Sequence, residues 1–509
     1  MSETEGVASC PRRRTRGRWF KYIAFRLLLV VGAGLGLRAY VLHVTEKRLQ
    51  AAVANLDRVD PGWRWEEVLA GRAQIPDEQN GARQVLAAAT HLPKNWPQTP
   101  AAPRQEPAEA KQRPADHPVQ KPEEGLPDRL AKVEPGERLD PNLTTSLRAE
   151  LKALAPALAE ARKLIGTAQG RYKIVWEKNL LATLVPHLEQ ARCVARLLEL
   201  DAALRAQDGD LEGAFASSRC IINAGRSIGD EPLFISQLVR MACQQTAVRS
   251  MERVLAQGTV SKEALQVAQK QLEDEAAQPL LWIALRGERA STSLVMERLY
   301  NGEITLDQLT DGRSQSPGWY DRLYAWLFVR PVVHNNQVVW LEIMTRWVET
   351  AKLPPAQRME AFERLADDLS GRKPTSAYTA LAVLFLPAAH KASKADNRVV
   401  ALLQCAQAAL AAERYRLLHG TWPASLQRLV PAFLTEVPDD PFGGGALHYR
   451  RLADGVVVYS VGPDKTDNGG TLDRNDPARK GADLGFRLWD VKRRRQPPAP
   501  KPPALPEKK

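Results

Sequence analysis

The chain contains few residues whose type and spacing would support catalysis. Its eight histidines are scattered, and none has a partner at the i, i+4 spacing of a helix. The sequence has no GxSxG, HExxH or Walker A motif, and no GxGxxG motif in a strand–turn–helix setting. Asp439 and Asp440 are adjacent carboxylates, which acid–base catalysis can use, but their Pro-Asp-Asp-Pro setting favours a turn. We therefore predict that the chain is not an enzyme.

Two acid–base pairs lie within predicted helices: Glu288 with Arg289, and Glu297 with Arg298. Neighbouring opposite charges on a helix are most simply surface ion pairs or capping contacts. We therefore expect each pair to form a surface ion pair or a capping contact rather than to act in catalysis.

The five cysteines do not form a recognisable metal-binding pattern. They show neither CxxC nor Cys/His spacing, so a zinc site is not expected. Cys10 precedes the apolar N-terminal segment, and the other four are predicted to be small buried side chains. A disulfide among Cys193, Cys220 and Cys243 stays open as an alternative if the protein faces an oxidising compartment.

The apolar segment at residues 19–44 predicts a single membrane anchor. Its uninterrupted apolar run, Leu27 to Leu37, reaches the roughly 20 residues of a spanning helix only when flanking arginines and a histidine are included. Arginines at the ends of a span can extend toward the headgroups. Basic residues precede the run, which predicts a cytoplasmic N-terminus and an extracytoplasmic bulk at the cell inner membrane. A cleaved signal peptide and a buried helix of a soluble protein are the alternatives.

The net charge of +12 is concentrated in the two ends of the chain. Residues 1–26 carry seven basic and two acidic groups, and residues 491–509 carry seven basic and one acidic group, which leaves +1 for the rest. No interior basic stripe with interleaved aromatic residues is present, so nucleic acid is not a predicted partner. The basic tail is predicted to be disordered and able to contact an anionic polymer or lipid surface.

Composition divides the chain into seven predicted segments. They are a basic leader (1–18), the anchor (19–44), a juxtamembrane helical segment (45–92), a proline-rich linker (93–123), an α-helical body (124–393), an α+β domain (394–490) and the basic tail (491–509). The linker is predicted to be an extended spacer. Apolar residues recur in the body with a period near 3.6, which predicts a mainly α protein of stacked, solenoid-like helical hairpins.

The α+β domain carries the most specific pattern. A helix from about Ala395 is predicted to end at Gly420, because glycine suits a left-handed C-cap. Residues 447–451 and 456–461 alternate like two antiparallel strands joined by a turn at 453–455.

This order of motifs resembles the C-terminal domain of type II secretion major pseudopilins. The matching phrases, which cover about a fifth of the chain, are Tyr415-x-x-x-x-Gly420-x-Trp422-Pro423, Leu426-x-x-Leu429-Val430, Pro438-Asp439-Asp440-Pro441-Phe442-Gly443 and Tyr459-Ser460-Val461-Gly462-Pro463-Asp464. The N-terminus lacks that family's processing site and the glutamate of its first apolar helix, so the domain looks like a reused module. The whole layout also resembles signal-anchored proteins of planctomycete-type bacteria, a resemblance that implies no activity.

The pseudopilin resemblance implies a calcium site. In that family the loop after the last strand binds calcium through aspartates and backbone carbonyls. Carried over to this chain, the candidate ligands are Asp464, Asp467, Asp473, Asp476 and Asp483. Calcium takes about six to eight oxygen ligands, which a loop rich in glycine and aspartate can supply. The alternative is that these aspartates only shape turns.

Together these features predict a membrane-anchored scaffold or protein-interaction protein of the bacterial cell envelope. Its expected partners are the membrane and other envelope proteins, and no small-molecule substrate is identified. One alternative is a component of a type II secretion or pilus-like apparatus. The other is an enzyme with a site in the tryptophan-rich region 319–347, which would require a deep pocket with convergent polar groups there.

Overall fold

The structure is a computed structural model of all 509 residues. It describes residues 15–97, 124–305, 308–309, 318–320, 330–370, 377–474, 476–477 and 479–498. The described residues are mainly helical, and near the C-terminus they contain a three-stranded antiparallel sheet. The predicted fold class, mainly α with a small α+β part at the end, is confirmed.

The N-terminal apolar segment lies within one long helix, α1 (Thr15–Val59). By length and composition this helix could cross a membrane, and none of its apolar window is buried within the protein. The juxtamembrane helix predicted from Glu46 to Leu56 is continuous with α1, because no helix-breaking residue separates the two. The helix ends before Gly62, whose φ of +76° suits glycine.

The chain forms two compact units, each built from segments that are distant in the sequence. The first contains residues 1–61, 293–343 and 374–384, and the second contains 62–292, 344–373 and 385–509. Within the first unit, His334 stacks on Tyr300 with ring centroids 3.7 Å apart. Its Nδ1 atom lies 3.5 Å from a carboxylate oxygen of Glu46 on α1.

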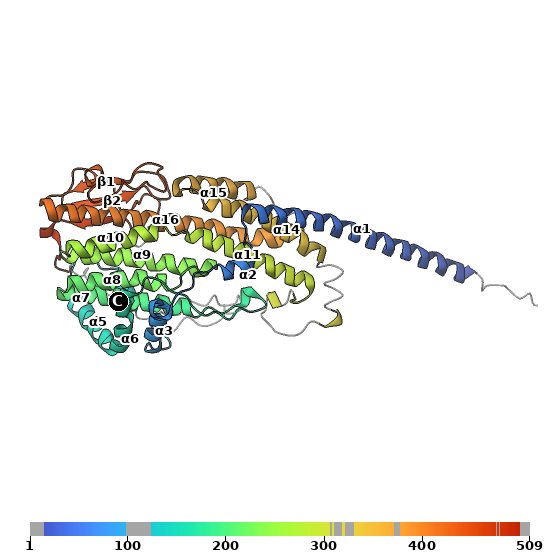
Figure 1. The fold of residues 1–509 in the computed structure, drawn as a ribbon, viewed down its shortest axis with the longest axis horizontal. Helices are drawn as coiled ribbons and strands as arrows, with labels where there is room; N and C mark the ends of the chain where they lie inside the picture. The colour runs from blue at the N-terminus through green and yellow to red at the C-terminus, as the bar shows by residue number, and fades with distance from the viewer. Residues whose placement is uncertain are drawn as a thin grey trace, which may run out of the picture. The chain divides into compact units, whose positions relative to one another are not determined.

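The second unit is built around consecutive helices joined by short turns, which Figure 1 shows lying side by side. They are α7 (His187–Asp208), α8 (Leu211–Arg226), α9 (Phe234–Gln257) and α10 (Lys262–Ala276). Asp210 caps α8 by accepting the Gly213 N–H at 3.0 Å. Ser261 caps α10 as predicted, through the Ala264 N–H at 3.3 Å. Shorter helices complete this part: α2 (Trp65–Ala70), α3 (Gly81–Thr90), α4 (Leu126–Ala131), α5 (Pro141–Ala153) and α6 (Ala155–Arg162).

The C-terminal strands lie beside the long helix α16 (Ala377–His419) (Figure 1). The sheet has the order β1 (His448–Leu452), β2 (Gly455–Ser460) and β3 (Leu484–Trp489), with Val458 opposite both Tyr449 and Phe486. The predicted hairpin and the left-handed cap at Gly420, with φ +74°, are both present. Side chains of α16, the sheet and α7–α9 form one continuous hydrophobic core. The sheet is therefore packed into the helical body rather than built around a core of its own.

The prediction of a disordered basic tail is wrong for residues 491–498. Arg494 is buried, and its Nη2 atom donates to both carboxylate oxygens of Glu413 at 2.9 and 3.0 Å. The backbone N–H of Arg495 donates to Ala256 at 3.0 Å, and that of Gln496 donates to Gly136 at 2.8 Å. Composition alone could not predict that residues 491–498 are ordered, because Glu413, Ala256 and Gly136, which bind them, lie far away in the sequence. Residues 499–509 lie outside the described residues.

For Glu288 and Arg289 the surface alternative is wrong, whereas Glu288 does make a capping contact, at the first residue of α9. Arg289 is completely buried, and its guanidinium lies 6.0 Å from the centroid of the Trp63 ring. Burial raises the pKa of Glu288, whose carboxylate accepts the Phe234 N–H at 3.1 Å. Glu297 of the second pair is exposed, as predicted.

The four described cysteines are buried free thiols, as predicted from their scattered positions. No disulfide joins Cys193, Cys220 and Cys243, so that alternative is not realised here. Most of the predicted linker, residues 98–123, and Cys10 lie outside the described residues.

Candidate functional site

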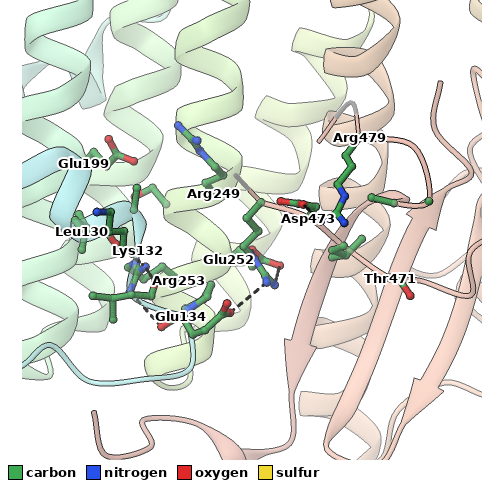
Figure 2. A pocket seen from close by; sticks show the side chains of 18 of the residues that line it. Leu130, Lys132, Glu134, Glu199, Arg249, Glu252, Arg253, Thr471, Asp473 and Arg479 are labelled. Atoms are coloured by element: carbon green, nitrogen blue, oxygen red, sulfur yellow. Dashed lines mark hydrogen bonds and ion pairs between the residues drawn. The ribbon is translucent and has the colours of Figure 1, made fainter. Parts of the chain in front are cut away.

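A pocket of about 570 Å³ lies entirely within the second unit, where α9 and the end of α4 meet the loop between β2 and β3 (Figure 2). We call it the α4–α9 pocket. Its walls are residues 130–135, Glu199 of α7, four residues of α9, and residues 471–474 and 479–482 of the loop. These segments are far apart in the sequence, so only the packing of the second unit creates the pocket.

Helix α9 supplies the charged wall of the pocket. Arg249, Glu252 and Arg253 are three and four residues apart, which places them on one face of the helix. Arg253 donates to the backbone carbonyls of Leu130 at 3.3 Å, Glu134 at 3.4 Å and Val133, and so holds the end of α4. Burial lowers the pKa of Arg253 to about 10, although Glu199 and Glu252 act in the opposite direction.

Arg474 ties the loop between β2 and β3 to α9. Its Nε and Nη2 atoms donate to the two carboxylate oxygens of Glu252 at 2.9 and 3.0 Å. Its Nη1 atom donates to Glu134 at 3.3 Å, and its guanidinium lies 5.8 Å from the centroid of the Trp489 ring. Burial alone would lower the pKa of Arg474, but Glu252 and Glu134 raise it overall. This paired geometry fixes the loop that forms the opposite wall of the pocket.

Four cations of the pocket are exposed to solvent. Two of them are paired, Lys132 with Glu124 and Arg479 with Asp473. Arg249 and Lys480 are exposed, and no ion pair is recorded for either among the residues that the structure describes. Arg249 lies on the same side of the pocket as Glu199 (Figure 2). Burial raises the pKa of Glu199, with Arg249, Arg196 and Arg253 opposing the effect. The lining residues carry six basic and four acidic side chains, so the pocket has a net positive charge.

The lining of the pocket combines charged, hydroxyl and apolar side chains. Neither histidine nor cysteine occurs among the lining residues identified in the described part of the chain. The hydroxyl of Ser250 is hydrogen-bonded to that of Ser218 at 2.7 Å, so it is not placed beside a base. Arg249 and Lys480 offer donors to a carboxylate, while Leu130, Leu472 and Ala482 offer apolar contact.

The five predicted calcium ligands are not brought to one point. Asp473 lines the pocket and accepts the Asp476 N–H at 2.9 Å, whereas Asp464, Asp467 and Asp483 are not among the lining residues identified in the described part of the chain. Among the residues with described positions, no group of three or more histidine, cysteine, aspartate or glutamate side chains could hold a metal. The conformation described does not fit an ion held by all five carboxylates, and calcium binding stays a prediction from the resemblance.

The aspartates instead accept hydrogen bonds from the loop. Asp483 is buried and accepts the N–H groups of Asn468 at 3.2 Å and Gly470 at 2.7 Å. Asp464 accepts those of Thr466 at 3.1 Å and Gly481 at 2.9 Å. Asp467 accepts the Gly469 N–H at 2.8 Å and the Tyr459 hydroxyl at 3.0 Å. Backbone hydrogen bonds lower the pKa values of Asp464 and Asp467.

Asp440, one of the two adjacent carboxylates in the Pro-Asp-Asp-Pro sequence, has a structural role. Asp440 is completely buried and accepts the N–H groups of Phe442 at 2.8 Å and Val461 at 2.9 Å, and the Ser460 hydroxyl at 2.6 Å. These contacts join its turn to the end of β2. They support the turn that the Pro-Asp-Asp-Pro sequence predicts.

The tryptophan-rich region does not line the α4–α9 pocket. Trp340 and Trp347 are buried core residues, and Trp347 packs on Phe362 with ring centroids 4.9 Å apart. Trp319 is exposed, and the remaining aromatic residues between 321 and 329 lie outside the described residues.

Apart from Asp473, a candidate calcium ligand, sequence reasoning missed the residues of the pocket. The available signal was three charges at i, i+3 and i+4 spacing in α9, a helix that is otherwise buried on most of its surface. That spacing shows a charged face, but the residues that cover it cannot be found locally.

A scan against protein-family models found no match, and searches of curated proteins and of solved structures found none either. The resemblance of the C-terminal domain to pseudopilins therefore stays a prediction.

Replacing Glu199 with glutamine should stabilise the full-length protein at neutral pH. Because burial raises the pKa of Glu199 in the folded state, the folded protein binds a proton at Glu199 more tightly than the unfolded chain does. Protonated Glu199 therefore contributes to stability below the ordinary glutamate pKa of 4.5. That contribution is lost as the pH rises through the pKa of Glu199 in the folded protein. We expect Glu199→Gln to raise the melting midpoint at pH 7, and the gain to vanish below pH 4.5.

The matched control is Glu189→Gln, at an exposed position on the same helix that is paired with Arg192. It should change the midpoint little at either pH. A loss of stability in Glu199→Gln at pH 7 would mean that the surrounding arginines outweigh burial.

Replacing Asp483 with alanine should destabilise the protein even in the presence of a chelator. Two N–H groups of the loop lose a buried acceptor, at a cost of about 1–3 kcal/mol for each group. Thermal melting with chelator and with calcium would measure this effect. Asp476→Ala, at an exposed position in the same loop, should have little effect in chelator. If Asp483→Ala destabilises only when calcium is present, the ion rather than these hydrogen bonds holds the loop.

Proposed function

We propose that this chain is a membrane-anchored scaffold or protein-interaction protein of the bacterial cell envelope. In this proposal α1 holds it in the inner membrane, and the α4–α9 pocket binds an acidic segment of a partner protein. The observation that carries the proposal is that two exposed cations, Arg249 and Lys480, line the pocket.

Several features support protein recognition at the pocket. Its volume of about 570 Å³ is suited to a few side chains of a peptide. Glu252 and Glu134 are engaged by Arg474, so these two carboxylates repel an acidic ligand less. Arg253 is committed to backbone carbonyls, and Lys132 and Arg479 are paired with Glu124 and Asp473. Arg249 and Lys480 are exposed and can reach an acidic ligand.

The proposed orientation follows from the charge around the anchor. Seven basic residues lie within residues 1–26, which favours a cytoplasmic N-terminus and an extracytoplasmic second unit. The exposed apolar surface of α1 supports its place in a bilayer.

The orientation can be tested with a membrane-impermeant maleimide on intact bacterial spheroplasts. In the natural sequence only Cys10 should react, and only after the membrane is permeabilised, because the other four cysteines are buried. A Cys10→Ser, Leu418→Cys variant should react without permeabilisation, since Leu418 is 59% exposed. The reverse pattern would contradict the proposed orientation.

Partner recognition can be tested with a fluorescent peptide of alternating glutamate and alanine. The full-length protein in detergent micelles should bind it more tightly than the matching lysine peptide, and added salt should weaken binding. Arg249→Glu should weaken binding by about tenfold or more, equivalent to roughly 1.4 kcal/mol.

Arg192→Glu is the control for this measurement, because Arg192 is a half-exposed arginine of α7 outside the pocket. It should leave peptide affinity nearly unchanged. Equal binding of the two peptides, or unchanged binding by Arg249→Glu, would contradict a site for acidic segments.

A further inference from the structure

A loop in the second unit presents large apolar side chains to solvent. It covers residues 171–186, between the end of the α6 region and α7. Val175 and Leu184 are each 84% exposed, the highest values among the large apolar side chains that the structure describes, and Leu181 is 47% exposed. Three exposed aliphatic side chains in one short loop indicate a contact surface.

Hydrogen bonds give this loop a defined conformation. Asn179 accepts the Leu181 N–H at 3.2 Å and begins a short 3-10 turn, and the Glu177 N–H donates to the Thr183 hydroxyl at 3.2 Å. Leu180, beside the exposed Leu181, is buried. The loop therefore holds one apolar side chain inward and presents its neighbours outward.

Both ends of the loop are held by the protein core. At its start, the Tyr172 ring is buried and stacks on His187 with centroids 4.3 Å apart. The Tyr172 hydroxyl lies 2.8 Å from that of Ser227. Because the ends are fixed, the exposed apolar side chains cannot be buried by a simple shift of the whole loop.

The loop contacts the part of the chain that directly follows α1. The Trp176 ring packs edge-on against Trp65, with centroids 4.9 Å apart. Arg171 donates to the carbonyls of Arg72 at 3.1 Å and Ala73 at 2.9 Å, and its own N–H donates to Asn80 at 2.9 Å. The loop is thus fastened to residues 65–80.

The length of chain between the anchor and this contact is short. Residues 45–59 are the last part of α1 and span about 22 Å at roughly 1.5 Å per residue. Trp65 follows α1 by only a few residues. If α1 spans a membrane, the loop is confined to within a few tens of ångströms of that membrane, which gives the bilayer a high effective concentration.

The charge and composition of the loop match an anionic lipid surface. Arg171, Lys173 and Lys178 against Glu177 give residues 171–186 a net charge of +2. Lysines together with exposed aliphatic residues are found in segments that lie in the membrane interface. We propose that this loop docks on the anionic lipid surface beside the anchor, with Val175, Leu181 and Leu184 entering the interface. This inference rests on the proposed anchoring by α1.

The test uses the full-length protein in nanodiscs of equal parts phosphatidylcholine and phosphatidylglycerol, with or without brominated phosphatidylcholine. An environment-sensitive fluorophore is attached to Leu184→Cys in a Cys10→Ser background. Leu28→Cys in the apolar run serves as the positive control, and Leu418→Cys at the end of α16 serves as the negative control. We expect brominated lipid to quench the labels at positions 184 and 28 several-fold and to leave the label at 418 unaffected.

The outcomes separate the loop from the anchor. Quenching at 28 with none at 184 would overturn docking of the loop while supporting the anchor. No quenching at either position would overturn both proposals. A label at 184 that is shielded from water but not quenched would mean that a protein surface covers the loop, which also overturns the inference.

A second variant tests the contribution of charge. Lys173→Glu with Lys178→Glu, in the Leu184→Cys background, should lose most of the quenching in the anionic nanodiscs. In nanodiscs of phosphatidylcholine alone, the variant and its parent should differ little. Undiminished quenching of the variant in anionic nanodiscs would overturn the role assigned to anionic headgroups.

Discussion

A buried carboxylate–guanidinium pair, Glu413 with Arg494, holds the end of the chain in place. Arg494 also donates to the carbonyls of Trp489 at 2.9 Å and Gly258 at 2.7 Å, so one side chain joins α16, β3 and the end of α9. Burial lowers the pKa of Arg494, and the charge of Glu413 opposes that effect. Removing Glu413 would leave the buried Arg494 guanidinium without its carboxylate partner, which is far more costly than the loss of an exposed pair. If Arg494 were removed, Glu413 would keep its pair with Arg416. This contact ties the end of β3, which also pairs with β2 along its length, to the helical body.

The α4–α9 pocket follows from that arrangement. Once β3 is fixed, Arg474 in the preceding loop can reach Glu252 on α9, and the Arg487 N–H donates to the same carboxylate at 2.8 Å. Glu252 of α9 therefore accepts hydrogen bonds both from β3 and from the loop that precedes it. The aspartates of the loop hold their own backbone, so the wall of the pocket is shaped by hydrogen bonds within the chain.

A second group of buried polar contacts surrounds the segment that follows α1. Arg286 donates to the carbonyl of Gly62 at 2.7 Å, and Arg72 donates to Asp230 at 2.9 Å. The N–H of Ala73 donates to the same aspartate at 2.8 Å. These contacts fasten the chain to the second unit soon after the anchor helix ends. Trp63 and Trp65 in this segment are buried, beside Arg289 and Trp176 respectively.

The sequence alone determined the features that depend on neighbouring residues. The apolar helix at the N-terminus, the cap at Ser261, the left-handed residue at Gly420 and the hairpin of β1 and β2 follow from local composition, spacing and backbone preference. The tertiary structure decided the third strand, the order of the tail, the burial of Arg289 and the pocket itself. Each of these depends on partners that are separated by tens to hundreds of residues. A charged residue looks the same in the sequence whether its partner is water or a distant carboxylate, and only the folded chain brings that partner within hydrogen-bonding distance.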